Sequence, residues 1–131
     1  MKFHTATIVL FLASFVNHAT AVFHLFTLNG IAYACGWTSD VTECDCVLGA
    51  AREQLSTNNM STEDFTVPTL CGSGQLDFYH TSGNTMEYYT HNGNGVALGK
   101  CTAFYLKRTC NVGSSSVVWY DYWVCTGICG T

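Results

Sequence analysis

The chain has eight cysteines, and all of them lie after residue 34. An even number of cysteines in a small chain is typical of a disulfide framework in an oxidising compartment. The sequence therefore predicts four bridges, but it does not say which residues they join. We predict no metal site and no cofactor, because the Cys44-x-Cys46 pair lacks the usual spacing of zinc ligands. The eight residues are Cys35, Cys44, Cys46, Cys71, Cys101, Cys110, Cys125 and Cys129.

Residues 1–21 have the form of a secretory signal peptide. A weakly basic start is followed by an apolar run from Ile8 to Val16 that is too short to span a bilayer. The run leads to an A-x-A site, and we predict cleavage after Ala21. No later stretch is long and apolar enough for a membrane helix, so we expect a secreted, extracellular protein without a membrane span. Residues 22–131 are then expected to form one disulfide-rich domain.

The hydrophobic pattern after residue 21 predicts an α+β fold. We expect a disulfide-stapled antiparallel β-sheet, curled into a sandwich or barrel, with one main α-helix near residues 42–56. Asn29-Gly30 is a strong turn signal, so residues 22–35 should form a hairpin. Further strands are expected at 65–70, where Pro68 suggests a sheet edge, and at 75–80, 85–91, 96–98, 101–108 and 116–125.

The expected helix has an apolar stripe with helical spacing, made by Cys44, Leu48, Ala51 and Leu55. On a helix, Cys44 and Cys46 would project about 200° apart. We therefore predict that these two cysteines bond different partners and fix the helix to two neighbouring elements.

The charge balance argues against some partners. Residues 22–131 contain nine acidic and four basic side chains, which gives a net charge of −5. Such a surface should not attract nucleic acid non-specifically, so we predict no nucleic-acid partner.

The strand expected at 116–125 carries large aromatic groups on both faces. Strand alternation places Trp119 and Trp123 on one face and Tyr120 and Tyr122 on the other. Either the strand is buried on both sides, or one aromatic face is a contact surface. These four residues are our candidate binding site, and a homodimer interface is the alternative use of the same surface.

The sequence contains no common catalytic signature, neither G-x-S-x-G nor H-E-x-x-H. We therefore predict a protein that is not an enzyme. The best acid–base set is His80, Glu87 and His91, with Arg108 as a phosphate contact, which would suit a ribonuclease-like hydrolase. The competing interpretation is that these are ordinary polar residues near strand ends, and His24 is read as a plain strand residue.

Asn59-Met60-Ser61 is an N-glycosylation sequon in a polar segment that we expect to form a loop. The sequence predicts an acceptor site at Asn59, but it does not determine whether the site is occupied.

The signal peptide, the small domain and the eight cysteines together resemble the small secreted cysteine-rich proteins of fungi. Glu43-Cys44-Asp45-Cys46, leading into a helix, resembles the E-C-x-C-helix element of the virally encoded smut killer-toxin α chain. The resemblance implies an effector or toxin that acts on a host or competitor. With the disulfide framework, the aromatic strand and the absent catalytic motif, we expect an effector-like virulence protein that binds a host protein or a cell-wall glycan without catalysis. A secreted toxin or antimicrobial protein is the alternative.

Overall fold

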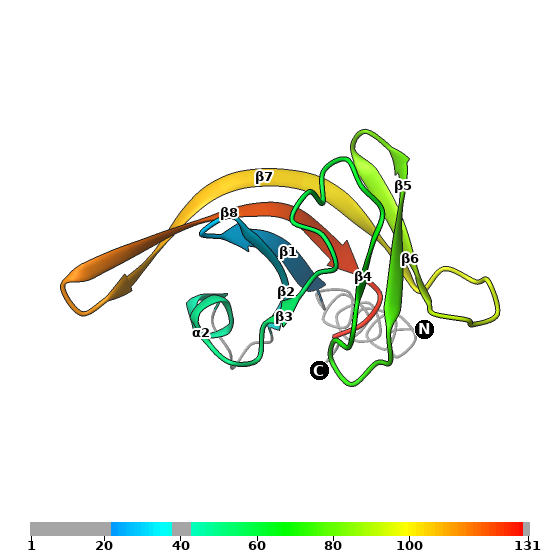
Figure 1. The fold of residues 1–131 in the computed structure, drawn as a ribbon, viewed down its shortest axis with the longest axis horizontal. Coiled ribbons are helices and arrows are strands. Elements are labelled where there is room, and N and C mark those ends of the chain that lie inside the picture. The colour runs from blue at the N-terminus through cyan, green and yellow to red at the C-terminus, as the bar shows by residue number, and fades with distance from the viewer. Residues whose placement is uncertain (1–21, 38–42, 130–131) are drawn as a thin grey trace, which may run out of the picture.

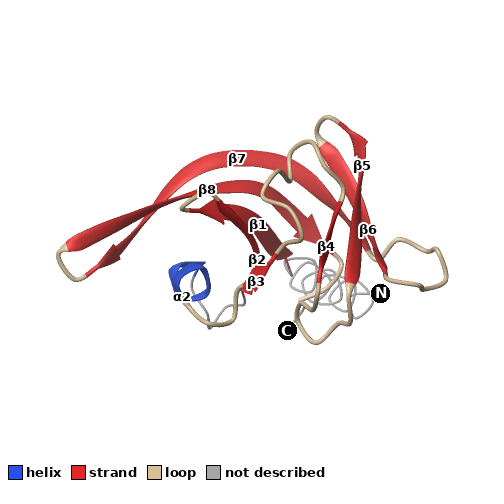
Figure 2. Ribbon diagram, viewed as in Figure 1, coloured by secondary structure: helices blue, strands red, loops and turns tan. Residues whose placement is uncertain are grey.

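The computed structural model describes residues 22–37 and 43–129, and the predicted signal peptide lies outside this part of the chain. Eight strands form one sheet in the order β3-β2-β1-β8-β7-β6-β5-β4, with every neighbouring pair antiparallel. Figure 1 shows this sheet with the short helix α2 below its arch, and Figure 2 shows how strands dominate. The predicted α+β fold is confirmed. The elements are β1 (Val22–Leu28), β2 (Ile31–Trp37), α2 (Glu43–Leu48), β3 (Glu53–Gln54), β4 (Phe65–Val67), β5 (Leu76–Ser82), β6 (Thr85–Thr90), β7 (Gly99–Val112) and β8 (Ser115–Thr126).

The first two strands form the predicted hairpin. Asn29 and Gly30 both have positive φ angles, 54° and 79°. Two such residues in succession make the tight turn whose twist matches that of the flanking strands. The Asn-Gly pair therefore sets the register in which Leu28 faces Ile31.

The sheet curls until its two edge strands, β3 and β4, come close to each other. Just after β3, the Ser56 N–H donates to the Thr66 carbonyl oxygen at 3.0 Å, and the Thr66 N–H donates to Ser56 Oγ at 2.9 Å. The result is a nearly closed, barrel-like sheet. Pro68 follows β4, and the prediction of an edge strand at this position is confirmed.

Two hydrophobic clusters lie on opposite faces of β1. Leu25 belongs to the larger cluster, inside the barrel, and the next residue, Phe26, belongs to the smaller cluster, beside α2. Successive strand residues point to opposite faces, so β1 is buried on both sides. The larger cluster includes Phe23, Leu25, Ala34, Phe65, Leu76, Phe78, Met86, Tyr88 and Trp123, and the smaller one includes Phe26, Leu28, Val47, Cys110 and Trp119.

The helix is much shorter than predicted, since it ends at Leu48 and not near residue 56. At Gly49 a Cβ atom would lie 2.4 Å from the Asp45 carbonyl oxygen, so the turn that ends the helix requires glycine. Beyond the turn, Gln54 pairs with β2 and the Leu55 N–H donates to a β2 carbonyl. The apolar stripe was therefore a misleading signal, because the backbone after residue 49 bonds to the sheet and not to itself.

Four disulfides staple the fold, as the cysteine count predicted, and such a set is typical of extracellular proteins. The two helix cysteines bond different elements, which confirms that prediction. One is bound to β2 and the other to the far end of β7. The pairs are Cys35–Cys46, Cys44–Cys110, Cys71–Cys129 and Cys101–Cys125.

Strands β7 and β8 form a long hairpin that extends well beyond the barrel (Figure 1). β6 pairs with β7 only as far as Thr102, so the continuation lacks a strand on that side among the described residues. We call residues 104–122 the arm. The strand predicted at 96–98 is wrong: this segment is irregular, Val96 is exposed, and β7 begins at Gly99.

Candidate functional site

Two of the four aromatic residues predicted to form a contact surface are buried. Trp119 has no exposed surface and Trp123 is 2% exposed. They belong to different clusters, although strand alternation had placed them on one face. Trp119 and Trp123 therefore do not offer a binding surface, and that half of the predicted site is corrected to core.

A β-bulge at Tyr122 explains the difference. On β1, Leu25 faces Trp123 and the next residue, Phe26, already faces Asp121, so Tyr122 is the extra residue. A bulge of this kind shifts the alternation of side chains between the two faces. Trp123 consequently points into the barrel, whereas Asp121 shares the opposite face with Phe26.

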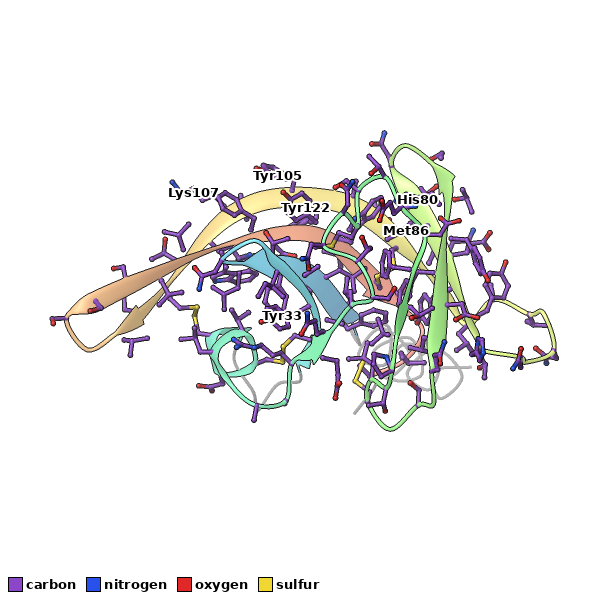
Figure 3. The ribbon with its side chains drawn as sticks, in the orientation of Figure 1. Tyr33, His80, Met86, Tyr105, Lys107 and Tyr122 are labelled. Carbon is purple, nitrogen blue, oxygen red and sulfur yellow. A yellow bond between two sulfur atoms is a disulfide. The ribbon has the colours of Figure 1, made fainter. Side chains whose placement is uncertain are left out.

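The remaining two tyrosines join a third that the sequence pattern did not single out. The ring of Tyr105 stacks on Tyr120 at 6.1 Å between centroids and meets Tyr122 edge-on at 4.9 Å. Tyr105 is 60% exposed, and both partners are partly exposed. We call these three residues the tyrosine cluster; Figure 3 shows Tyr105 and Tyr122 on the convex side of the arch.

The register irregularity in β7 creates this cluster. Between Ala103 and Leu106 the pairing with β8 shifts, which leaves Phe104 and Tyr105 opposite the bulged Tyr122. Phe104 turns toward His24, with ring centroids 6.1 Å apart, and Tyr105 turns to the other face. Burial, reinforced by the neighbouring Tyr105, raises the pKa of Tyr122 above that of a free tyrosine.

His24 is not the plain strand residue that we expected. Its Nδ1 lies 2.8 Å from Oδ2 of Asp121, which is fully buried, and Arg108 Nε donates to the same oxygen at 3.1 Å. Arg108 also lies over the ring of Trp119 at 5.6 Å. A buried carboxylate needs such partners. An aspartate within an aromatic strand was the sequence signal for this network, which joins the base of the arm to β1.

The predicted acid–base set does not come together. His80 lies on the same face of β5 as the buried Phe78. Glu87 on β6 and His91, just after β6, lie on the opposite, outer face of the hairpin. His80 pairs with Met86, whereas Thr90, the residue before His91, pairs with Leu76. These two pairs lie four residues apart along the hairpin, about 13 Å, so His91 is far from His80. The hydrolase site proposed from His80, Glu87 and His91 is therefore not assembled.

The two histidines have local partners instead. His80 Nδ1 lies 3.1 Å from Asp64 Oδ1, and its Nε2 lies 3.0 Å from the Met60 carbonyl oxygen. These contacts fasten the 57–64 loop to β5. The backbone N–H of His80 donates to the same Asp64 carboxylate, and this bond lowers the pKa of Asp64. His91 Nδ1 lies 2.9 Å from Asp77 Oδ2.

Asn59 lies exposed in that loop, as expected from the polar sequence around it. Its carbonyl oxygen accepts hydrogen bonds from the N–H groups of Thr62 and Glu63 at 3.2 and 3.0 Å. The side chain of the sequon asparagine is thus accessible, and glycosylation there stays a prediction.

Two further kinds of feature are absent from the described part of the chain. No group of three or more His, Cys, Asp or Glu side chains in residues 22–37 and 43–129 is arranged to hold a metal ion. Within the same ranges, no helix has the length and apolar character needed to cross a membrane.

Comparison with known protein families, characterised proteins and solved structures finds no match to this chain.

Proposed function

We propose that this is a secreted, non-enzymatic binding protein that holds a partner protein against the tyrosine cluster of its arm. The observation that carries the proposal is the exposed position of Tyr105, packed between Tyr120 and Tyr122 on a disulfide-anchored strand pair. The effector-like class expected from the sequence, with a host protein as the partner, fits this mode of action.

Tyrosine is suited to such a surface. Its ring contributes a large apolar area with few rotatable bonds, and its hydroxyl can still form hydrogen bonds. Aromatic residues are enriched at the centres of protein interfaces. Val118, 40% exposed, extends the apolar area next to the cluster, since it lies opposite Thr109 on the same face of the arm.

The charge of the arm differs from that of the rest of the domain. The arm contains Lys107, Arg108 and Asp121, and Arg108 is paired with the buried Asp121, so Lys107 is the basic charge on the face of the tyrosine cluster, whereas residues 22–131 as a whole carry a net charge of −5. Lys107 is exposed and lies opposite Tyr120 in the β7–β8 register. Opposite charges on two surfaces favour their encounter, so the partner should present an acidic side chain opposite Lys107.

The backbone of the arm adds a second means of attachment. Beyond Thr102, the outer edge of β7 has no neighbouring strand among the described residues. Such an edge can hydrogen-bond an extended segment of another chain. The disulfide between Cys44 and Cys110 holds the arm in place, which lowers the conformational entropy lost on binding.

The experiment uses immobilised protein from an oxidising expression host, exposed to extracellular and cell-surface protein fractions. Proteins retained by the wild type are identified by mass spectrometry, purified and measured directly by biolayer interferometry. We expect Tyr105→Ala to weaken binding at least tenfold. Val96→Ala is the matched control, because Val96 is 64% exposed but lies outside β7 and β8, and it should leave binding unchanged.

Three outcomes would contradict the proposal. One is a partner that binds wild type and Tyr105→Ala equally well. Another is a wild-type dimer in sedimentation analysis that Tyr105→Ala converts to monomer, which would make the surface a homodimer interface. The third is growth inhibition of fungi or bacteria that is unaffected by Tyr105→Ala, which would favour the toxin alternative.

A further inference from the structure

A second surface, which shares no residue with the arm, has the features of a ligand site. Two adjoining hollows of about 430 and 330 Å³ lie on the outer side of β4, β5 and β6. They share Asp77, Tyr79 and His91, so together they form one groove across these strands. Their volumes are in the range of sites for small molecules, roughly 300–1,000 Å³.

The polar groups at the centre of the groove are held in fixed positions. The side chain of Asp77 is 16% exposed, and its Oδ2 lies 2.9 Å from Nδ1 of His91. The backbone of His91 is held at the end of the hairpin, where its amide N–H donates to the Gln75 carbonyl oxygen at 2.9 Å. A carboxylate has acceptor sites for several donors, so Asp77 can accept further hydrogen bonds from a ligand.

Aromatic rings lie beside these polar groups. Tyr79 is 46% exposed, and its ring meets that of Tyr89 edge-on with centroids 5.8 Å apart. In the β5–β6 register Tyr89 faces Asp77, so one ring flanks the carboxylate across the strands. An exposed ring next to fixed hydrogen-bonding groups presents an apolar plane with a polar border.

The charge of the groove restricts the ligand. Asp64 lines the smaller hollow and Asp77 lines both, and no lysine or arginine among the described residues lines either of them. Phosphates, sulfates and acidic sugars would meet repulsion from these carboxylates. A sugar ring without charge has a C–H face that packs on an aromatic ring, and hydroxyl groups that hydrogen-bond to carboxylate and imidazole.

We propose that this groove binds an uncharged oligosaccharide, with one sugar ring in each hollow and the ring of Tyr79 stacked on a sugar face. This site goes beyond the proposed function, since it shares no residue with the tyrosine cluster. Asp77 and His91 orient the sugar hydroxyls, and Asn92, at the loop end of the larger hollow, supplies an amide.

The test is a titration of isotope-labelled protein with neutral oligosaccharides of glucose, mannose and N-acetylglucosamine, followed by NMR. We expect at least one series to shift amide signals of Tyr79, Tyr89 and residues 91–95. Tyr79→Ala should weaken that binding at least tenfold. Tyr79→Phe, which keeps the ring, should bind within about threefold of wild type.

Control measurements distinguish the groove from the arm and from a site for peptides. Tyr105→Ala should bind the sugar like wild type, whereas loss of binding in that variant would move the sugar to the arm and overturn the proposal. Absence of shifts with all three series would overturn it. So would oligolysine that binds the groove more tightly than any sugar, because the groove would then be a site for cationic peptides.

Discussion

Replacement of Asp121 by asparagine tests the buried network at the base of the arm. Asp121 is fully buried, and its carboxylate lies 2.8 Å from His24 Nδ1 and 3.1 Å from Arg108 Nε. Asparagine keeps the shape but turns an NH₂ group toward one of these nitrogens. Each hydrogen bond to a charged group is worth roughly 1.5–3 kcal/mol, and breaking a buried pair costs about 3–5 kcal/mol.

The structure places the expected loss near the lower limit of that range. The Arg108 side chain is 24% exposed, so water can replace part of its lost partner. We therefore expect Asp121→Asn to lower the free energy of unfolding by about 3 kcal/mol. For a domain of this size that corresponds to a decrease in Tm on the order of 10 °C.

Equilibrium unfolding in guanidinium chloride, followed by tryptophan fluorescence, measures this loss. The matched control is Asp64→Asn, because Asp64 also contacts a histidine, at 3.1 Å, but its side chain is 56% exposed. Exposed pairs contribute about 0–1 kcal/mol. If the two substitutions cost the same, within error, the reasoning from burial is refuted.

Further measurements test other parts of the structure. Strong reductant should unfold the protein or lower its Tm greatly, because bridges that close loops of 11 to 66 residues each add about 3–4 kcal/mol to the free energy of unfolding. An unchanged Tm under reductant would contradict this expectation. Burial raises the pKa of Tyr88 to about 12, so absorbance at alkaline pH should resolve at least one late-titrating tyrosine. The stability that Tyr88 contributes below pH 10 should decline as pH rises toward 12. Gly99→Ala should prevent native folding, since the added Cβ would lie 1.8 Å from a backbone oxygen. Gly74→Ala is the control, because its Cβ would meet open space, and thermal melts should show a Tm within a few degrees of wild type. The pKa of Asp64 should lie below the ordinary value in an NMR titration, and its stabilising contribution should be lost as pH falls through that range.

Local signals in the sequence predicted local structure well. Asn29-Gly30 predicted a hairpin because two left-handed residues suffice to reverse a strand. The strand predicted at 75–80 is found as β5, where the alternate residues Leu76 and Phe78 are both fully buried. The cysteine count predicted four bridges, and the helix geometry predicted different partners for the two helix cysteines. Each of these inferences depends on residues within a few positions of one another.

The candidate sites depended on contacts that local patterns do not encode. Alternation failed at Tyr122, because a bulge is set by pairing with β1, which lies almost a hundred residues earlier in the chain. For the same reason Tyr105 was missed, since only the shifted β7–β8 register brings it to Tyr122. The apolar stripe that begins at Cys44 predicted a long helix, but the backbone of Glu53 and Gln54 pairs with β2 instead.

A β-rich, disulfide-stapled domain could be predicted from the sequence, because turn residues, strand alternation and cysteine number are properties of short segments. The folded arrangement was needed to show which cysteines pair, which aromatic residues are exposed, and that Asp121 contacts His24, 97 positions away in the chain. It also decided that Asp77 and His91 line a groove while His80 fastens a loop. The physical reason is that burial and pairing are settled by the closure of the whole sheet, which brings together residues that are far apart in the chain.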